Sequence, residues 1–501
     1  MKCQQNLALS LAGGYSNYNT MICKRNTQED IAVFHSDFLR NQLFHNRLRR
    51  VRRAVLFTLI LMLSVSLSLT SPILGQDDEV KSIAVLYLDP QHAVDWMDLL
   101  YRRVEAEGDS APSAARIYGY AGVAMYESLL GGMPLNRTLA GQIEHLPDLP
   151  YWEEDIIYDW LSVMDATMAE VLPELFYQPS PESAEAFGDL LETHTAARTE
   201  EVGEQVVADS HEYGHILAEE LIKWINEDGF LYSRESKTEY TLPTGTYGTG
   251  FYTLTDNFSS PVEPYWGNLR PFIMPDAYVC HEYPNVAYST DPESTFYKQA
   301  QEVVRMDRNQ TEEQRETARY WVDTPGQTGT PAGHWWSIAT QLVDQLDLDL
   351  QRTAMMYAML GPAMADSFIS CWALKYDIML ERPVTYIRKN IRQRWIPYIQ
   401  TPPFPEYPSG HSVVSATASE VLTGMFGAVA FEDETHIIYD HEPLRRSYTS
   451  FEAAANEAAI SRLYGGIHYR AAIENGLRQG RCIGQLVNRT LILNPFLQGG
   501  E

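Results

Sequence analysis

The 501-residue sequence predicts an all-α protein, with one large domain and long loops over one face. Three observations lead to this prediction. From about residue 90 onward, apolar residues recur every three or four positions, which is the period of helices with one buried face. Capping residues, prolines and glycine pairs mark where these segments start and stop. The alternation of apolar and polar residues that indicates strands is scarce.

The N-terminal 75 residues have the layout of an export signal. The basic run RLRRVRR (47–53) precedes the apolar run AVLFTLILMLSVSLSL (54–69) and a polar, acidic exit. This apolar run is short for a membrane span. We therefore expect residues 1–75 to be an N-terminal extension with a signal peptide, and an uncleaved signal-anchor is the alternative. Residues 76–501 then form a single domain in a secreted, periplasmic or otherwise extracellular protein.

One helix of this domain is expected in SAPSAARIYGYAGVAMYESLLGG (110–132). It begins with Ser110 as the cap and ends at a glycine pair, and its small residues predict close contact with another helix. The acidic stretch 178–206 is expected to be a solvated connector or a surface helix. The Tyr-, Thr-, Gly- and Pro-rich stretch 231–290 is expected to form the long loops. Further helical periods cover 159–172, 208–229, 311–322, 332–346 and 350–380.

The net charge of −28 is spread unevenly along the chain. Residues 1–75 carry nine Lys/Arg and three Asp/Glu, or +6, so the rest carries about −34. Such a surface repels nucleic acid and anionic membranes. We expect no nucleic-acid partner, and membrane contact only through an uncleaved N-terminal segment. An anion site would have to be a local basic pocket.

Cysteine usage predicts neither a disulfide framework nor a zinc site. Only Cys280, Cys371 and Cys482 follow the export-like segment, and no C-x-x-C spacing occurs. One bridge among these three is compatible with the sequence, and its pairing stays open.

Three separated segments carry candidate chemistry, and the first is KYDIMLERP. Lys375 and Arg382 are seven residues apart, so a helix would place both side chains on nearly one face, with Pro383 ending or bending that helix. A lysine and a forked arginine can hold one tetrahedral anion from two sides. The apolar flanks argue against the commoner alternative, a solvated helix face.

The second segment, PPFPEYPSGHS (402–412), leads through four prolines to a helix start. Ser409 offers a hydroxyl, the Gly410 N–H can approach an anion closely, and the helix N-terminus adds partial positive charge. His411 can exchange protons with a bound group. The alternative is a proline-rich turn with Ser409 as an ordinary cap.

The third segment, AISRLYGGIHYRAAIENG (459–476), supplies a further cation and a second histidine. Arg462 is the cation, and Gly465 and Gly466 predict a break that moves His468 off a simple helical face. A histidine with a purely structural role is the alternative.

In this order, K-x6-R-P, P-S-G-H and S-R-x5-H resemble the vanadium-dependent haloperoxidases and the related type 2 phosphatidic acid phosphatases and acid phosphatases. The resemblance spans residues 375–468. It implies two four-helix-bundle-like halves and a vanadate cofactor, whose site phosphate could also occupy. It also implies a role for each motif residue: Lys375, Arg382 and Arg462 neutralise the oxyanion, Ser409 and Gly410 donate hydrogen bonds to it, His411 is the acid–base group, and His468 bonds vanadium or attacks phosphorus.

Two aromatic residues favour the peroxidase side of this resemblance. Trp372 and Phe404 stand at the offsets where chloride-oxidising haloperoxidases carry a Trp and a Phe at the halide site. The chain is therefore expected to be closest to the chloroperoxidase-like branch, and core packing is the alternative role of both residues. Asp323 resembles the acidic residue that hydrogen-bonds the PSGH histidine in that branch. His334 is expected either near the same site or at an exposed helix start.

The chain departs from the family pattern at one position. Many members carry Asp four residues after the final histidine, and here that position is Ala472. A backbone carbonyl or Glu474 is expected to orient His468 instead. The departure weighs more against a phosphatase, because a nucleophilic histidine depends more on its orientation.

The predicted function is an exported vanadate-dependent haloperoxidase-like enzyme, with residues 76–501 as its catalytic domain. It would oxidise halide with hydrogen peroxide, and an organic acceptor is a further candidate substrate. The first alternative is a secreted acid phosphatase that forms a phosphohistidine and acts on phosphate esters. The second is a non-catalytic phosphate-binding helical protein, against which the two intact histidines count.

Overall fold

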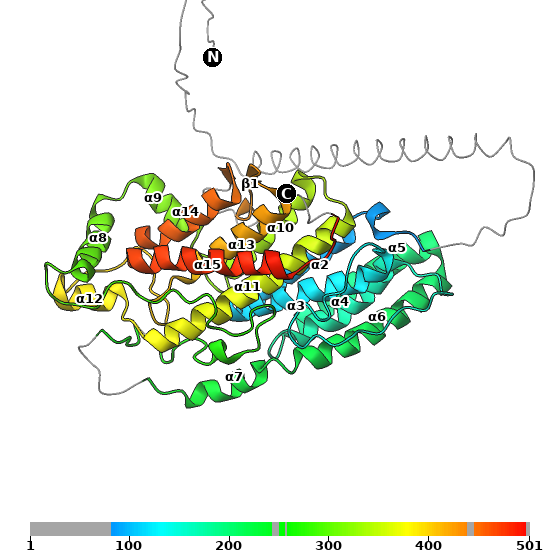
Figure 1. Cartoon of the computed structure of the whole chain (residues 1–501), viewed down its shortest axis with the longest axis horizontal. Coiled ribbons are helices and arrows are strands. Elements are labelled where there is room, and N and C mark those ends of the chain that lie inside the picture. The colour runs from blue at the N-terminus through cyan, green and yellow to red at the C-terminus, as the bar shows by residue number, and fades with distance from the viewer. Residues whose placement is uncertain (1–81, 243–249, 256–257, 438–444, 497–501) are drawn as a thin grey trace, which may run out of the picture. The chain divides into compact units, whose positions relative to one another are not determined.

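The computed structural model describes residues 82–242, 250–255, 258–437 and 445–496 (Figure 1). The chain divides into two units, residues 1–79 and 80–501. The predicted export segment belongs to the first unit and lies outside the described residues. Within the described ranges, no helix combines the length and apolar character that crossing a membrane requires.

The predicted all-α fold class is confirmed by the described part of the chain, which contains fourteen α-helices and one two-stranded antiparallel ribbon. Their bounds are α2 (Gln91–Glu107), α3 (Ala111–Leu129), α4 (Trp160–Glu174), α5 (Pro181–Val202), α6 (Glu204–Ile225), α7 (Phe230–Ser236), α8 (Thr295–Asn309), α9 (Glu312–Tyr320), α10 (Thr330–Gln345), α11 (Leu350–Ile378), α12 (Pro383–Asn390), α13 (Gly410–Phe426), β1 (Phe431–Asp433), β2 (Arg446–Tyr448), α14 (Phe451–Tyr464) and α15 (Arg470–Thr490).

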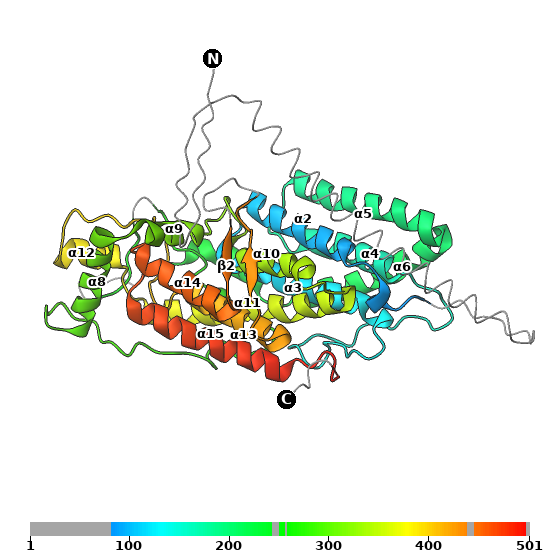
Figure 2. The same ribbon diagram turned by 90° about the horizontal axis from the view of Figure 1, so that it is seen from above.

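Helices α3 and α11 pack against each other at the centre of unit 80–501. Figures 1 and 2 show α4, α5 and α6 on one side of this pair and α13, α14 and α15 on the other. Small residues permit the central contact: a Cβ at Gly122 would lie 2.3 Å from the Tyr357 carbonyl oxygen, and one at Gly361 would lie 2.4 Å from that of Tyr118. The close helix contact predicted from the small residues of 110–132 is confirmed.

Most of the expected boundaries agree with the structure. Ser110 caps α3 by accepting the Ser113 N–H, and the acidic stretch forms the surface helix α5. The stretch 231–290 is mainly loop, and α7 occupies its start. The part of this loop at residues 272–274 is fixed by the buried Asp366 of α11, whose carboxylate accepts their three backbone N–H groups at 2.6 to 2.9 Å.

The prediction of one helix through KYDIMLERP is wrong. Helix α11 ends at Ile378, and Met379 takes a left-handed conformation with φ of 52°. Pro383 begins α12 instead of ending a helix, because its fixed φ and missing N–H suit the first helical position. Lys375 therefore lies in the last turn of α11, and Arg382 is the N-cap residue of α12.

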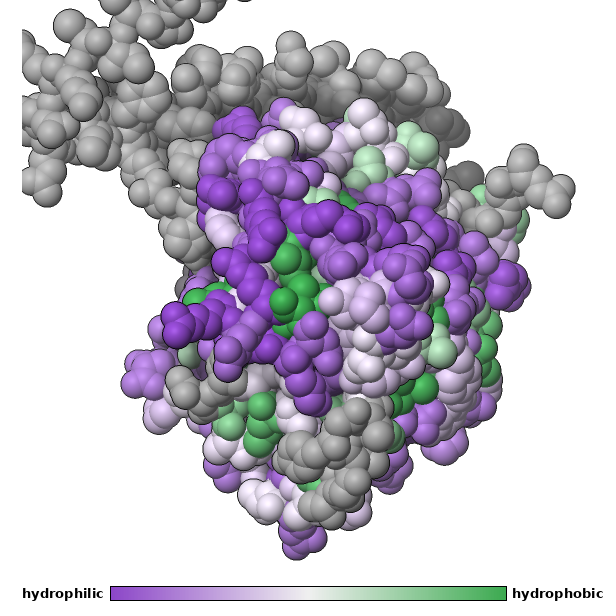
Figure 3. Space-filling model, turned by 90° about the vertical axis from the view of Figure 1, so that its left-hand side faces the viewer, coloured by the Kyte–Doolittle hydropathy of each residue, from purple (hydrophilic) through white to green (hydrophobic). Residues whose placement is uncertain are grey.

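One disulfide and one free thiol account for the cysteines of the described residues. Cys280, in the loop over α11, is bonded to Cys482 of α15, and Cys371 is buried and free. Figure 3 shows that the face nearest α8 and α12 is mainly hydrophilic, with apolar side chains in small patches. Small, separated apolar patches are ordinary for a protein surface and do not mark a docking site.

Candidate active site

The second and third candidate segments line a cavity of about 970 Å³, and the first lies directly behind its wall. Gly410 and His411 reach its wall from the N-terminus of α13, and Arg462 reaches it from the last turn of α14. His468 comes from the short loop between α14 and α15, where Gly466 takes a φ of 77° and breaks the helical path as predicted. The helix N-terminus, one cation and two imidazoles thus face one space.

Arg382 borders this space through its contact with His468. Its Nε donates to the Phe404 carbonyl at 2.8 Å, and its Nη1 donates to the Ile467 carbonyl at 3.0 Å and to His468 Nε2 at 3.1 Å. Its Nη2 is buried and has no hydrogen-bond partner among the described residues. A buried guanidinium nitrogen that lacks an acceptor is what a bound oxyanion would satisfy.

Lys375 points toward the proline-rich loop instead of the cavity wall. Its ammonium donates to the carbonyl oxygens of Pro405 and Glu406, both at 3.1 Å, and to that of Pro408. Ser409 is buried and accepts the Ser412 N–H as the cap of α13, so the capping alternative is realised, and its hydroxyl hydrogen can still be donated.

The buried cations are short of opposite charge. Burial lowers the pKa of Lys375 to about 7 and the pKa values of Arg382 and Arg462 to about 10. Their carboxylate neighbours are Glu406, beside the first two, and Asp323, near the third. Because burying a charge without a partner is costly, this arrangement favours a bound anion.

Glu406 replaces the missing aspartate as the orienting partner of His468. Its Oε1 lies 2.9 Å from His468 Nδ1 and accepts the Tyr469 backbone N–H at 2.8 Å. The proton of the neutral imidazole is thus on Nδ1, and the Nε2 lone pair accepts from Arg382. Burial and then the nearby cations lower the pKa of His468 well below its usual value, which keeps Nε2 unprotonated.

The expected orienting role of Glu474 is wrong. Glu474 is 54% exposed and lies 3.7 Å from Arg470, so its carboxylate faces solvent. The carbonyl of Ala472 accepts the Ser409 N–H at 3.1 Å and so fixes the loop, not the imidazole. The signal for Glu406 was in the sequence, as an acid enclosed by prolines in PPFPEYPSGH.

His411 stands at the end of a buried chain of alternating acids and imidazoles. Its Nε2 lies 3.6 Å from Asp323 Oδ2, which is longer than a hydrogen bond. Asp323 Oδ1 lies 2.9 Å from His334 Nδ1, and His334 Nε2 lies 2.8 Å from Asp433 Oδ2. His334 is buried and stacks on Trp321 at 4.1 Å, so its expected exposed alternative is wrong.

The predicted halide-site aromatics form one wall of the cavity. Trp372 and Phe404 lie with ring centroids 5.0 Å apart, and both line the space. The Phe404 ring is close to two cations: Lys375 Nζ lies 5.2 Å and the Arg382 guanidinium carbon 4.7 Å from its centroid. This wall excludes water beside the cations and strengthens their fields.

The chain is similar to known proteins that share these features. The family model of the VCPO second helical-bundle domain matches residues 355–492, which contain all three motifs. The crystal structure of the first bacterial vanadium-dependent iodoperoxidase is 34% identical, with a TM-score of 0.74, and the match covers 81% of this chain and 97% of that chain. The search of curated proteins gave no match.

Two bacterial vanadium-dependent chloroperoxidase structures share the fold at lower identity. The holo-type structure is 13% identical, with a TM-score of 0.54 and coverage of 83% of this chain and 95% of that chain. The apo-type structure is 13% identical, with a TM-score of 0.56 and coverage of 82% and 98%. The expectation that the chain is closest to the chloroperoxidase-like branch is therefore wrong, because the iodoperoxidase is more similar in both sequence and structure.

Replacing Glu406 by alanine should weaken oxyanion binding, because His468 loses the acceptor that orients it. We expect the dissociation constant for orthovanadate to rise about tenfold to a hundredfold, measured by calorimetric titration. Glu406→Gln keeps an acceptor and should lose less. Glu474→Ala is the matched control and should bind as the wild type does. Weakened binding in the Glu474 variant alone would contradict the assignment.

The Asp433→Asn variant should lose stability in a pH-dependent way. Burial alone would lower the pKa of His334, but Asp323 and Asp433 outweigh it and raise that pKa to about 10. The stability from protonated His334 is therefore complete below about pH 6.5 and disappears as the pH rises toward about 10. Urea unfolding should show a larger loss near pH 6 than near pH 9.5.

The neighbouring exposed Glu432 supplies the control for this measurement, since it is 56% exposed and pairs only loosely with Arg445 at 3.8 Å. Glu432→Gln should cause a small change that does not vary across the same pH range. Equal losses at both pH values for Asp433→Asn would show that His334 is not held as a cation.

Proposed function

Because this chain belongs to the vanadium-dependent haloperoxidase family, we propose that it is a vanadate-dependent peroxidase that oxidises a halide with hydrogen peroxide. The family expected from the three motifs is thereby confirmed. The observation that carries the proposal is the orientation of His468 at the cavity: Glu406 holds its Nδ1, and its unprotonated Nε2 faces Arg382. Such a nitrogen beside unpaired cations suits a metal oxyanion.

The residues present fit vanadate. His468 Nε2 would bond the metal, and Arg382, Arg462 and the Gly410 N–H would hold its oxygens. Lys375 would contribute its charge to the site, while its ammonium group stays hydrogen-bonded to the proline-rich loop beside Phe404. When bound, vanadate supplies a Lewis-acid centre that activates hydrogen peroxide toward attack by a halide.

His411 is the group placed to take a proton from peroxide. Burial and then Arg462 lower its pKa to about 4, against the opposing charge of Asp323. The imidazole is therefore neutral at neutral pH, and its Nε2 is buried without a hydrogen-bond partner in the described residues. Asp323, clamped by His334, would stabilise the imidazolium once the proton has moved.

We propose iodide as the preferred halide, with bromide next. Trp372 and Phe404 give the cavity an apolar wall, which suits a weakly hydrated, polarisable anion held beside cations. The 34% identical relative is an iodoperoxidase, which supports the same choice.

The phosphatase alternative stays open on one observation. The absence of an aspartate after His468 weighed against a nucleophilic histidine, but Glu406 supplies the same orientation at 2.9 Å. The proposed peroxidase and a phosphatase therefore differ in what occupies the site, not in its protein ligands. The functional test must follow both activities.

Purified protein should oxidise iodide with hydrogen peroxide only after orthovanadate is added. His411→Ala should still bind vanadate but lose about a hundredfold to ten-thousandfold in kcat/KM for peroxide, because the proton acceptor is gone. His468→Ala should lose both binding and activity. The exposed histidine variant His215→Ala should match the wild type.

The same preparations should be tested for p-nitrophenyl phosphate hydrolysis without vanadate. Phosphate-ester turnover that vanadate abolishes, together with no oxidation of iodide or bromide at any pH, would overturn the peroxidase proposal and leave the phosphatase. Neither activity in folded protein would leave only an anion-binding role.

We also propose that the protein is exported, as the N-terminal pattern predicts. The Cys280–Cys482 disulfide supports this, since such bonds persist mainly in oxidising compartments. N-terminal sequencing of protein recovered from outside the cytoplasm should find a start shortly after the apolar run. Full-length chain confined to the cytoplasm, with both cysteines reduced, would contradict the proposal.

A further inference from the structure

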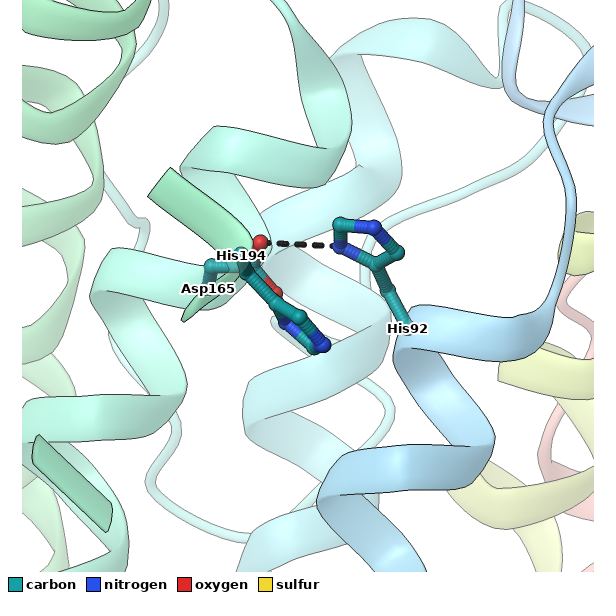
Figure 4. Close-up of side chains that lie close together, drawn as sticks. All are labelled: His92, Asp165 and His194. Carbon is teal, nitrogen blue, oxygen red and sulfur yellow. Dashed lines mark hydrogen bonds and ion pairs between the residues drawn. The ribbon is translucent and has the colours of Figure 1, made fainter. Parts of the chain in front are cut away.

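A second cluster of ionisable residues lies in the helices of the N-terminal half, apart from the cavity. His92 of α2, Asp165 of α4 and His194 of α5 lie together there, and Figure 4 shows both imidazoles beside the Asp165 carboxylate. His92 Nδ1 lies 3.0 Å from Asp165 Oδ2, and His194 Nδ1 lies 3.0 Å from Asp165 Oδ1. One nitrogen or oxygen from each residue falls within 4.8 Å of the others. None of the three residues lines the cavity.

His194 faces a carboxylate with each of its ring nitrogens. Its Nδ1 approaches Asp165, and its Nε2 lies 3.3 Å from Asp95 Oδ2. A neutral imidazole carries one N–H, so one of these contacts would set a lone pair against a carboxylate oxygen. Each ring nitrogen of His194 therefore needs a positive group between it and its carboxylate. One nitrogen has the N–H, and the other has either a second proton or a metal ion.

Asp95 has the position of an outer partner for a metal-binding histidine. It faces the Nε2 of His194, on the ring edge away from Asp165, and its Oδ1 is held by the Gln91 side chain at 2.7 Å. Metal-binding histidines regularly donate their other N–H to a carboxylate, which fixes the tautomer and strengthens the ligand. The same contact here leaves the His194 Nδ1 lone pair directed at the cluster.

A further histidine, His211, lies on the neighbouring helix α6. His211 has a buried Nε2 without a hydrogen-bond partner among the described residues. It is not one of the three residues whose ligand atoms lie within 4.8 Å of one another, so it is a neighbour of the cluster and not one of its ligands. Helices α2, α4 and α5 each bring one side chain to the cluster, the usual construction of a metal site in a helical bundle.

We propose that His92, Asp165 and His194 bind a divalent transition-metal ion, with zinc as the best match, and that Asp95 positions His194. Two imidazole nitrogens and one carboxylate oxygen are ligands that zinc prefers. Tetrahedral bonds of about 2.0 to 2.2 Å place ligand atoms about 3.3 to 3.6 Å apart. The imidazole nitrogens lie 3.0 Å from the two oxygens of Asp165, so an ion requires the side chains to move apart by a few tenths of an ångström.

Binding requires a small rearrangement of the two rings. They stack with centroids 3.8 Å apart and planes inclined by 27°, so they must turn until both Nδ1 lone pairs converge. His92 is 17% exposed at the start of α2, which gives it room to turn and gives an ion a route from solvent. The bound ion would cross-link α2, α4 and α5.

Cobalt(II) titration of the full-length, metal-stripped protein tests this site directly. We expect one saturable equivalent per chain, with the visible absorption of a low-coordinate cobalt(II) site, and displacement of the cobalt by zinc(II). His92→Ala should raise the cobalt dissociation constant at least tenfold, and Asp95→Asn should raise it by about tenfold through the lost outer contact. Thermal melts without metal verify that each variant is folded.

His215 supplies the matched control, because it lies on α6 beside Glu170 and Glu219 but is 54% exposed. His215→Ala should leave cobalt binding unchanged, and zinc should raise the melting temperature of wild type and of this control but not of His92→Ala. No saturable cobalt binding, or binding that is equal in wild type and His92→Ala, would overturn the proposal. Neither result depends on vanadate or on peroxidase activity.

Discussion

Burial of three cations around one histidine lone pair is the constraint on which the active site depends. Lys375, Arg382 and Arg462 are all nearly inaccessible to solvent, and their pKa values are lowered because burial penalises the charged form. Two carboxylates offset part of this charge, and each of them is also engaged by a histidine. The fold therefore stabilises an incompletely neutralised site that an oxyanion would complete.

The proline-rich loop forms the frame of this site, and buried cations hold it in place. Lys375 donates to three of its carbonyl groups, and Arg382 donates to a fourth at Phe404. The loop thus positions Glu406 beside His468, and it ends at Ser409, which caps α13. One short segment sets the orientation of the axial imidazole and the position of the helix N-terminus.

The sequence predicts the fold class and the three motifs well because both depend on local patterns. Helical period and capping are local, and the motif residues are identified by type and spacing. The helix through Lys375 and Arg382 was mispredicted because spacing alone cannot reveal the left-handed Met379 that ends α11. An acid enclosed by prolines marks Glu406 in the sequence, but its pairing with His468, 62 residues away, could not be predicted, nor could that of His334 with Asp433, 99 residues away. Such contacts follow from packing, not from local pattern.

A crystal structure of the protein soaked in orthovanadate would test the central claim most directly, using the anomalous signal of vanadium. The account predicts one vanadium per chain, bonded to His468 Nε2, with Arg382 Nη2 and Arg462 turned toward its oxygens. Vanadium bound elsewhere, or a cavity that stays without it while His468 Nε2 keeps its contact with Arg382, would contradict the account.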